Sequence, residues 1–467
     1  MTGDIMQRMS DQGRIQNFLT GSTLSILFSM FNLIVFSFIL TWYDTSLFYI
    51  FAISSVIYSV WIILFLNKRR ALDVKRFDIS SKNQSAVMQL IGGIQEIKLN
   101  NCEQQKRWEW EGIQASLFRF SVKSLSLSQI EQTGAFFINE SKNIVITFIV
   151  AKSVIEGQLT LGGMMAIQYI VGQLNSPIEQ MLGFLQQLQD AKLSLERLNE
   201  IHKLDDEEPS GKVFQRELPS DKTLMLKELS FTYPGAGNEP VLLNVNLRIP
   251  EGKTTAIVGM SGSGKTTILK LLLRFYEPQR GELRVGQMNL DQIGFRFWRG
   301  QCGSVMQDGF IFSDSITRNI AVGDEHPNIR KLKHAIKMAN IEDFIDSLPL
   351  GLNTKIGQEG NGISQGQKQR ILIARAVYKD PEYIFFDEAT NSLDANNEKA
   401  IMENLEKFFQ GRTVVVVAHR LSTVKNADNI VVLDKGKIIE EGTHEILTQK
   451  KGSYYNLVKN QLELGNS

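Results

Sequence analysis

The segment GMSGSGKTT, Gly259 to Thr267, combines glycines with one lysine and two threonines. The apolar run TTAIVG leads into it and predicts a buried strand, and ILKLLLRF follows and predicts a helix. In that setting the glycines let the backbone turn so that its N–H groups point at a phosphate. Lys265 supplies a charge for the β- and γ-phosphates, Thr266 offers a hydroxyl ligand for Mg²⁺, and the helix N-terminus adds its positive end. The segment therefore predicts a nucleotide phosphate loop.

Two adjacent carboxylates, Asp387 and Glu388, end a second apolar strand in the segment YIFFDEAT. An Asp at a strand end beside a phosphate loop typically holds Mg²⁺, here expected through water. The next carboxylate can polarise an attacking water. Taken alone, such a pair could simply cap the edge of a strand. The phosphate loop in the same chain favours a site that hydrolyses a nucleotide.

Further motifs lie in a fixed order around these two segments. They are FTYPG (231–235), VMQD (305–308), ISQGQKQR (363–370), NSLD (391–394) and VVVVAHR (414–420). In order and spacing, and in being joined to a membrane-like first half, the chain resembles an ATP-binding cassette (ABC) transporter. The resemblance covers essentially the whole chain and implies that ATP and Mg²⁺ are used.

The resemblance implies roles for single residues. Tyr233 is expected to stack on adenine, with a core tyrosine as the alternative. Gln307 is expected to reach Mg²⁺ and to couple the site to the membrane helices. His419 is expected to hold the γ-phosphate and the attacking water, and Asp394 to link two sites across a dimer. The expected catalytic residues are Glu388, His419, Lys265 and Gln307; the metal ligands are Thr266, Gln307 and Asp387; the nucleotide-binding residues are Tyr233, Gly259, Ser261, Gly262, Ser263, Gly264, Lys265, Thr266, Thr267, Ser364, Gly366, Gln367 and Asp394.

The family signature LSGGQ is altered in this chain, where it is Ile363-Ser-Gln365-Gly-Gln. Ser364, Gly366 and Gln367 match the family, and they open a helix whose N-terminus suits the γ-phosphate bound by a second subunit. Gln365 replaces a glycine that could adopt a positive φ. Backbone contact between residue 365 and the phosphate is therefore less secure than at Gly366. Activity is still expected, because every catalytic side chain is present.

The composition excludes several classes of protein. Of 467 residues, 43% are hydrophobic and 22% charged, with a net charge of +1. A disordered chain would be less apolar, and a nucleic-acid-binding protein would be more basic. The two cysteines, Cys102 and Cys302, cannot form a disulfide framework or a cysteine-based zinc site. No nucleic-acid partner is expected.

The first half of the chain contains two long uncharged runs, Ile15–Tyr43 and Thr45–Asn67. A helix needs about 20 apolar residues to cross a bilayer core, so both runs are predicted spans; the alternative is two helices buried in a large soluble core. Basic residues flank the pair and only Asp44 separates the runs. The positive-inside rule then places both outer ends in the cytoplasm and Asp44 outside.

A second apolar pair follows the polar residues 68–133. Gly157–Ile178 is uncharged, whereas Gly134–Ala151 is interrupted by Glu140 and Lys142. Glu140 either lines a cavity or lies at the cytoplasmic interface. An even number of spans keeps the nucleotide site in the cytoplasm. The expected spans are about 20–43, 45–67, 134–155 and 158–180.

These observations predict a multidomain protein. An all-α transmembrane domain (1–200), with about four spans and long cytoplasmic extensions, is followed by a linker (201–221) and an α/β P-loop nucleotide-binding domain (222–467). The expected location is the cytoplasmic (inner) membrane, multi-pass, with the ATP-binding domain in the cytoplasm.

The branch of the family is suggested by IQEIKLNNCEQQKRWEWE (94–111) and by the signature, which resemble peptidase-containing peptide exporters. Subunits of such exporters have six membrane helices, so the first two helices and the peptidase domain are expected to be missing from this chain. The expected function is ATP-driven export of a peptide or bacteriocin-like molecule, with a second, identical subunit and membrane lipid as partners. The alternatives are export of lipids or hydrophobic small molecules, and a truncated chain that hydrolyses ATP without transport.

Overall fold

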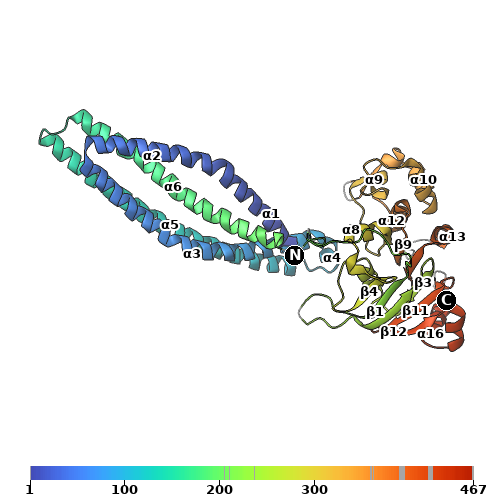
Figure 1. The fold of residues 1–467 in the computed structure, drawn as a ribbon. Coiled ribbons are helices and arrows are strands. Elements are labelled where there is room, and N and C mark those ends of the chain that lie inside the picture. Colours follow the sequence, from blue (N-terminus) through green and yellow to red (C-terminus); the bar gives the residue numbers. More distant parts are fainter. Residues whose placement is uncertain are drawn as a thin grey trace. The chain divides into compact units, whose positions relative to one another are not determined.

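The computed structural model describes residues 2–203, 206–209, 211–235, 237–357, 360, 362–388, 395–418 and 424–464. The chain divides into two compact units, Met1–Asp205 and Asp206–Ser467 (Figure 1). The boundary between the units falls within the predicted linker, 201–221.

The first unit is a bundle of long helices. Asp44 separates the helix of the first uncharged run from the helix of the second. Its carboxylate accepts a hydrogen bond from the backbone N–H of Ser46 at 2.7 Å and so caps the start of the second helix. The helices are α1 (Thr2–Asn17), the π-helical turn η1 (Phe18–Ser22), α2 (Thr23–Tyr43), α3 (Thr45–Gly92), α4 (Ile94–Leu99), α5 (Glu103–Ile155) and α6 (Leu161–His202).

Two of these helices are much longer than a membrane is thick. α3 has 48 residues and α5 has 53. At 1.5 Å per residue each is more than about 70 Å long, against roughly 30 Å for a bilayer core. The excess forms the predicted extension, with the short helix α4 between α3 and α5.

Among the described residues, three helical segments are long and apolar enough to cross a membrane: Arg8–Tyr43, Thr45–Gly92 and Glu103–Ile155. The predicted span at 158–180 lies in α6, which is not one of them, because polar residues such as Gln168 and Asn175 lower its mean hydropathy. The sequence analysis favoured the segment 158–180 over the segment in α5 as a membrane span, whereas the structure favours the segment in α5. Four spans remain a prediction.

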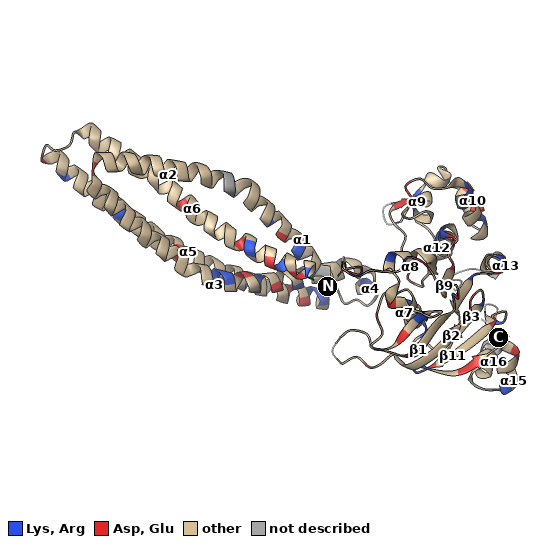
Figure 2. Cartoon of the chain, viewed as in Figure 1, with Lys and Arg blue, Asp and Glu red and all other residues tan. Residues whose placement is uncertain are grey.

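The charge distribution separates two parts of the helical bundle. Charged residues gather toward the start of α1 and the end of α6, and the rest of the bundle is mostly uncharged (Figure 2). In the uncharged part, α2, α3, α5 and α6 share a core that includes Leu40, Leu47, Ile146 and Leu174. Large apolar side chains on the outside, such as Phe38 and Phe148, are 70% exposed. An exposed apolar surface of this kind fits contact with lipid.

The second unit is built on two sheets. A six-stranded sheet has the order β12-β11-β3-β10-β9-β6, parallel except for β12, and a four-stranded antiparallel sheet has the order β2-β1-β4-β5. The strands are β1 (Leu224–Phe231), β2 (Leu242–Ile249), β3 (Thr254–Val258), β4 (Arg280–Val285), β5 (Met288–Asn289), β6 (Cys302–Val305), β7 (Asp314–Ser315), β8 (Lys355–Ile356), β9 (Tyr383–Asp387), β10 (Thr413–Val417), β11 (Asn429–Asp434) and β12 (Lys437–Gly442).

The parallel strands are buried along their length, since β9 and β10 are continuous apolar runs with both faces covered. β7 and β8 pair separately. The helices and helical turns of this unit are α7 (Lys265–Leu272), η2 (Leu290–Gln292), α8 (Phe295–Gln301), α9 (Ile316–Ile320), α10 (Ile329–Met338), α11 (Glu342–Asp346), η3 (Gly351–Asn353), α12 (Gln365–Lys379), α13 (Ala395–Phe409), α15 (His444–Lys450) and α16 (Ser453–Leu464).

Residues at the start of the second unit pack onto α8. Glu207 forms a two-pronged ion pair with Arg299, at 2.7 and 2.8 Å. The carboxylate of Glu208 accepts a hydrogen bond from the backbone N–H of Arg296 at 2.8 Å. This part of the predicted linker therefore belongs to the folded second unit.

Candidate functional site

The predicted site residues that follow β3, β6 and β9 lie at the carboxyl edge of the parallel sheet. β10 lies between β3 and β9, and Ile257, Val417 and Asp387 stand at the same level across the three strands. The loops that follow these strands therefore share one edge, where ligands bind in open α/β sheets. β6 flanks β9, which brings exposed Gln307 to the same edge, two residues beyond the end of β6.

The phosphate loop takes the turn that its glycines allow. Gly259, Gly262 and Gly264 have φ values of +151°, +80° and +106°. A Cβ at position 259 would lie 2.1 Å from the carbonyl oxygen of Leu433, and one at 264 would lie 2.7 Å from a Leu242 methyl group. Gly259 and Gly264 are therefore required for both conformation and space.

Lys265, the first residue of α7, folds its side chain back over this loop. Its ammonium donates hydrogen bonds to the carbonyl oxygens of Gly259 and Met260, each at 2.9 Å. The side chain is 6% exposed, and burial lowers its pKa, opposed by the nearby carboxylates of Glu388 and Asp387. A buried cation is thus held at the mouth of the loop, where a phosphate could replace the two carbonyl oxygens as its partner.

Asp387 ends β9 and is 1% exposed. Neither of its carboxylate oxygens has a hydrogen-bond partner of standard geometry among the residues that the structure describes. Burial raises the pKa of Asp387 above its usual range, and the neighbouring Thr266 hydroxyl and Lys265 ammonium oppose that rise. A buried carboxylate with open oxygens beside a threonine hydroxyl is a donor set that suits Mg²⁺.

Glu388 has an unusual backbone conformation for a residue with a side chain. Its φ is +52°, and its backbone N–H donates to the carbonyl oxygen of Val417 at 3.0 Å. Left-handed non-glycine residues are uncommon, and such strain gathers at functional sites. The hydrogen bond to β10 fixes the residue at the end of β9, half-buried.

Tyr233 is anchored to α7, because its hydroxyl lies 3.1 Å from the Thr267 hydroxyl. Its ring packs edge-on against Phe231 and Tyr276, with centroid distances of 5.0 and 5.2 Å. The ammonium of Lys270 lies 5.8 Å from the ring centroid. This packing places the half-buried ring beside the phosphate loop, and its stacking on adenine remains a prediction.

The other loop side chains divide by burial. Ser261 is exposed, whereas Ser263 is 3% exposed and its hydroxyl oxygen has no partner among the described residues. Like Asp387, Ser263 is a buried polar residue whose side chain lacks a hydrogen-bond partner of standard geometry in the described part of the chain, as a ligand-binding residue would.

The signature segment begins α12. Ser364 and Gln367 form a capping box: the Gln367 backbone N–H donates to the Ser364 hydroxyl at 3.2 Å, and the Ser364 N–H donates to the Gln367 side chain at 2.8 Å. Gln365 is the first residue of the helix and is not among those with positive φ. Position 365 therefore does not need the positive φ that a glycine would allow, at least in this conformation.

The signature and the phosphate loop come from different parts of the second unit. α12 packs against α9, α10 and β6, whereas the loop follows β3. Gly366 lies in the first turn of α12. His419 and Asp394, two of the predicted site residues, lie outside the described residues.

The structure adds a contact that the motifs did not indicate. The turn between β11 and β12 braces the phosphate loop, because the Gly436 N–H donates to the Ser263 carbonyl oxygen at 3.1 Å. Leu433 fills the space that a side chain at Gly259 would need. The dipeptide Lys435-Gly436 signals a turn, but nothing local in the sequence indicates its partner.

Two protein-family models match the chain. One, described as the ABC transporter transmembrane region, matches residues 1–178, and the other, described as ABC transporter, matches residues 242–391. The chain belongs to the ABC transporter family. The predicted fold, a helical transmembrane domain followed by an α/β nucleotide-binding domain, is confirmed, and the chain is a membrane protein.

Two curated relatives of this ABC transporter are named for translocation of toxins. The α-hemolysin translocation ATP-binding protein HlyB of Proteus vulgaris is 37% identical over 461 residues, 97% of this chain and 64% of the relative. The leukotoxin translocation ATP-binding protein LktB of Mannheimia haemolytica is 37% identical over 466 residues, 99% of this chain and 65% of the relative. The chain thus spans just under two thirds of the length of these relatives.

A solved structure of a bacterial Atm1-family ABC exporter with ATP bound is similar along almost the whole chain. The TM-score is 0.89 and the identity 25%, over 98% of this chain and 80% of the other. The similarity spans both units, so the ABC transporter architecture applies to the helical bundle as well as to the sheet unit.

Proposed function

We propose that the chain is a subunit of an exporter in the cytoplasmic membrane, which uses ATP hydrolysis to move a polypeptide out of the cell. The observation that carries this proposal is the convergence of Lys265, Thr266, Asp387 and Glu388 at one sheet edge. The same chain also has helices that are long and apolar enough to cross a membrane. The 37% identity to two toxin-translocation proteins supports a polypeptide substrate.

ATP would bind with its phosphates on the loop after β3. The loop N–H groups and the N-terminus of α7 face the phosphates, and the Lys265 ammonium exchanges its carbonyl partners for phosphate oxygens. Thr266, Asp387 and Gln307 are the residues that would hold Mg²⁺. Bound Mg²⁺ neutralises phosphate charge.

Hydrolysis needs a positioned water. Glu388, fixed at the end of β9 by its hydrogen bond to Val417, is the proposed general base. His419 follows β10, the strand between β3 and β9, and is proposed to hold the γ-phosphate and the water. Tyr233 is proposed to stack on the adenine.

The active site would be completed by a second, identical chain. The capped N-terminus of α12, with Ser364, Gly366 and Gln367, is suited to a γ-phosphate. In this proposal it approaches the phosphate loop of the partner, and Asp394 links the two sites. ATP binding then closes the dimer and shifts the helices, and hydrolysis resets them, so that binding energy changes a conformational equilibrium.

The experiment that tests the ATPase assignment compares the chain in lipid nanodiscs with its Glu388→Gln variant. We expect the variant to bind ATP normally but to turn over several orders of magnitude more slowly. Glu382→Gln is a matched control, because Glu382 immediately precedes β9, at the end of the strand away from Glu388, and pairs with Lys222. Near-normal hydrolysis in Glu388→Gln would remove Glu388 from the proposed role.

A further inference from the structure

The segment that follows Gln307 is packed onto α12, the helix that begins with the signature. This segment, 308–315, lies between β6 and α9. The chain turns at its start, since the backbone N–H of Gly309 donates to the carbonyl oxygen of Met306 at 3.2 Å. α9, at the other end of the segment, packs against α12 (Figure 1). A short connection therefore joins Gln307 to the signature helix.

Gly309 makes the first contact with α12. A Cβ at this position would lie 2.2 Å from a methyl group of Leu372, so the absence of a side chain lets the segment approach the helix this closely. Leu372 is buried in the core of the second unit. Gly309 is not among the glycines with positive φ. The glycine therefore serves the close approach and not an unusual turn.

Arg375, on α12, makes the second contact and reaches two points of the chain after Gln307. Its guanidinium donates to the carbonyl oxygen of Phe310 at 3.0 Å and to that of Asn319, on α9, at 2.8 Å. A further N–H donates to the side-chain oxygen of Asn319 at 3.3 Å. Burial lowers the pKa of Arg375, and no carboxylate among the described residues opposes that effect. The partners of this cation are therefore the oxygens of Phe310 and Asn319.

Asn319 extends the contact to the rest of the segment. Its fully buried side chain donates to the carbonyl oxygens of Phe312 at 2.9 Å and of Ser315 at 3.1 Å. Its oxygen accepts a hydrogen bond from the backbone N–H of Phe312 at 2.8 Å, and Arg375 donates to the same oxygen. The residues from Phe310 to Asn319 thus form one hydrogen-bonded network, which Arg375 attaches to α12.

The helix α12 connects this network to the signature. Arg375 lies eight residues beyond Gln367, or about 12 Å along the helix at 1.5 Å per residue. Both residues belong to one continuous helix of 15 residues. Gln307 precedes the first contact, at Gly309, by two residues. A displacement of Gln307 would therefore reach the signature through the segment and Arg375.

We propose that Arg375 is a positioning residue for ATP hydrolysis, because it makes Gln307 and the signature helix move as one piece. The proposal rests on the proposed role of Gln307 at the metal. It adds that the helix proposed to meet the γ-phosphate of the partner also sets the orientation of Gln307 toward the nucleotide of its own subunit. Lysine could not replace the arginine, since a planar guanidinium reaches two carbonyl groups in fixed directions and an ammonium does not.

The first test combines Arg375→Lys with Gln307→Ala in the full chain in lipid nanodiscs and measures single-turnover hydrolysis of radiolabelled ATP. We expect Arg375→Lys to lower the rate about tenfold, as when a group that orients a metal ligand is lost, and Gln307→Ala to lower it at least as much. The double variant should be no slower than Gln307→Ala alone, because Arg375 acts through Gln307. Arg412→Lys is the matched control with an expected wild-type rate, since Arg412 pairs with Asp380 at the far end of α12.

The second test, hydrogen exchange, needs neither nucleotide nor metal. In the nucleotide-free chain, Arg375→Lys should speed amide exchange within 308–316, whereas Gln307→Ala and Arg412→Lys should not. Gly309→Ala is a second variant that leaves every charge in place, because its methyl group would collide with Leu372 from the side of the segment. It should match Arg375→Lys in both tests, and it replaces that variant if the lysine protein does not fold.

Losses that multiply in the double variant would overturn this inference alone. So would a wild-type rate in Arg375→Lys, or unchanged exchange within 308–316 in that variant. Normal hydrolysis in Gln307→Ala would overturn both this inference and the proposed role of Gln307. The two failures are therefore distinguishable, since only the second one affects the single variant of Gln307.

Discussion

The Lys265 ammonium donates a hydrogen bond to the Gly259 carbonyl oxygen at 2.9 Å, so the bond joins the two ends of the phosphate loop. The bond, with its counterpart to Met260, keeps a buried cation in place before any anion arrives. The positive charge is therefore already held beside the loop that we propose binds phosphate, which reduces the reorganisation needed on binding.

Replacement of this cation should remove most activity. We expect Lys265→Met to lower ATP turnover by about 10²–10³-fold, the usual loss when one group that stabilises transition-state charge is removed. Lys333→Met, on the exposed face of α10, should leave turnover unchanged. A steady-state ATPase assay checks both, and turnover in Lys265→Met within a few-fold of wild type would contradict the role.

The buried carboxylate of Asp387 should lower the stability of the folded protein at neutral pH. Because burial raises the pKa of Asp387, the folded state binds its proton more tightly than the unfolded state does. The stabilisation from protonation is present below the ordinary pKa of about 4 and is lost as pH rises through the raised value. At neutral pH without nucleotide and metal, Asp387→Asn should therefore be more stable than the wild type and have a higher Tm.

The same variant should lose Mg²⁺-dependent hydrolysis, and its gain in Tm should shrink as the pH is lowered toward 4. Thermal denaturation across that range measures the gain. A variant less stable than wild type at neutral pH would show that Asp387 has a stabilising partner that compensates for its burial.

Tyr233 distinguishes a stacking role from a packing role. Tyr233→Ala should weaken ATP binding by about 1–3 kcal/mol if the ring stacks on adenine as aromatic rings do on bases. Tyr233→Phe removes only the hydroxyl contact to Thr267 and should bind ATP nearly as well as wild type. Fluorescent-nucleotide titration measures both, and an unchanged affinity in Tyr233→Ala would reassign the residue to the core.

The altered signature should tolerate its glutamine. Since Gln365 begins α12 with a helical backbone, Gln365→Gly should not raise ATP turnover, and it should cost up to about 1 kcal/mol of stability. ATPase assays and chemical denaturation test the two statements. A marked rise in turnover would mean that residue 365 needs glycine freedom in another conformation.

Local sequence was sufficient for the parts of the site that are contiguous. The glycines, Lys265 and Thr266 of the loop, and the carboxylates after β9, are fixed by neighbours within a few residues. Sequence could not show that β10 lies between β3 and β9, nor that the turn at Gly436 braces the loop. Both depend on pairings between segments far apart in the chain.

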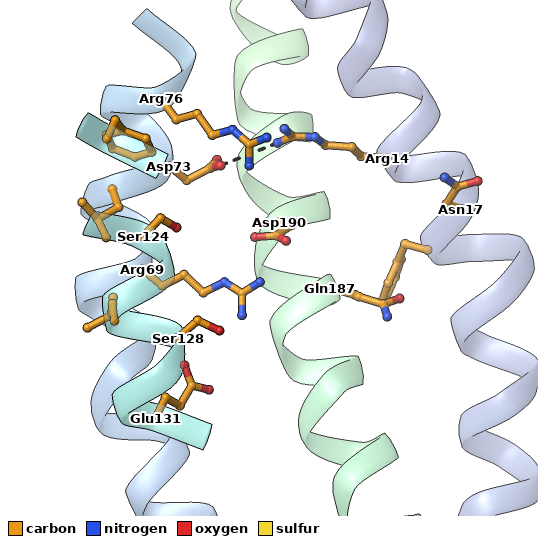
Figure 3. A pocket seen from close by; sticks show the side chains of 14 residues that line it. Arg14, Asn17, Arg69, Asp73, Arg76, Ser124, Ser128, Glu131, Gln187 and Asp190 are labelled. Atoms are coloured by element: carbon orange, nitrogen blue, oxygen red, sulfur yellow. Dashed lines mark ion pairs between the residues drawn. The ribbon is translucent and has the colours of Figure 1, made fainter. Parts of the chain in front are cut away.

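The membrane half shows the same limit. Uncharged runs predicted α2 and the start of α3. The absence of charge favoured the segment of α6 over that of α5, whereas by mean hydropathy the helix α5, and not α6, is among the described helices that could cross a membrane. The sequence did not predict the polar cavity between α1, α3, α5 and α6 (Figure 3). Its lining residues Arg14, Arg69 and Asp190 are more than 50 residues apart in the chain and meet only when three helices pack together. None of them forms a motif.

Transport itself is the most direct test of the account. The chain would be reconstituted in liposomes, with ATP, Mg²⁺ and labelled carboxymethylated α-lactalbumin, a permanently unfolded polypeptide, on the outside. The account predicts that wild type makes the label protease-resistant in an ATP-dependent way and that Glu388→Gln does not. Steady ATP hydrolysis with no protected polypeptide would contradict it, and ATP-dependent movement of a labelled lipid instead would assign the pump to lipids.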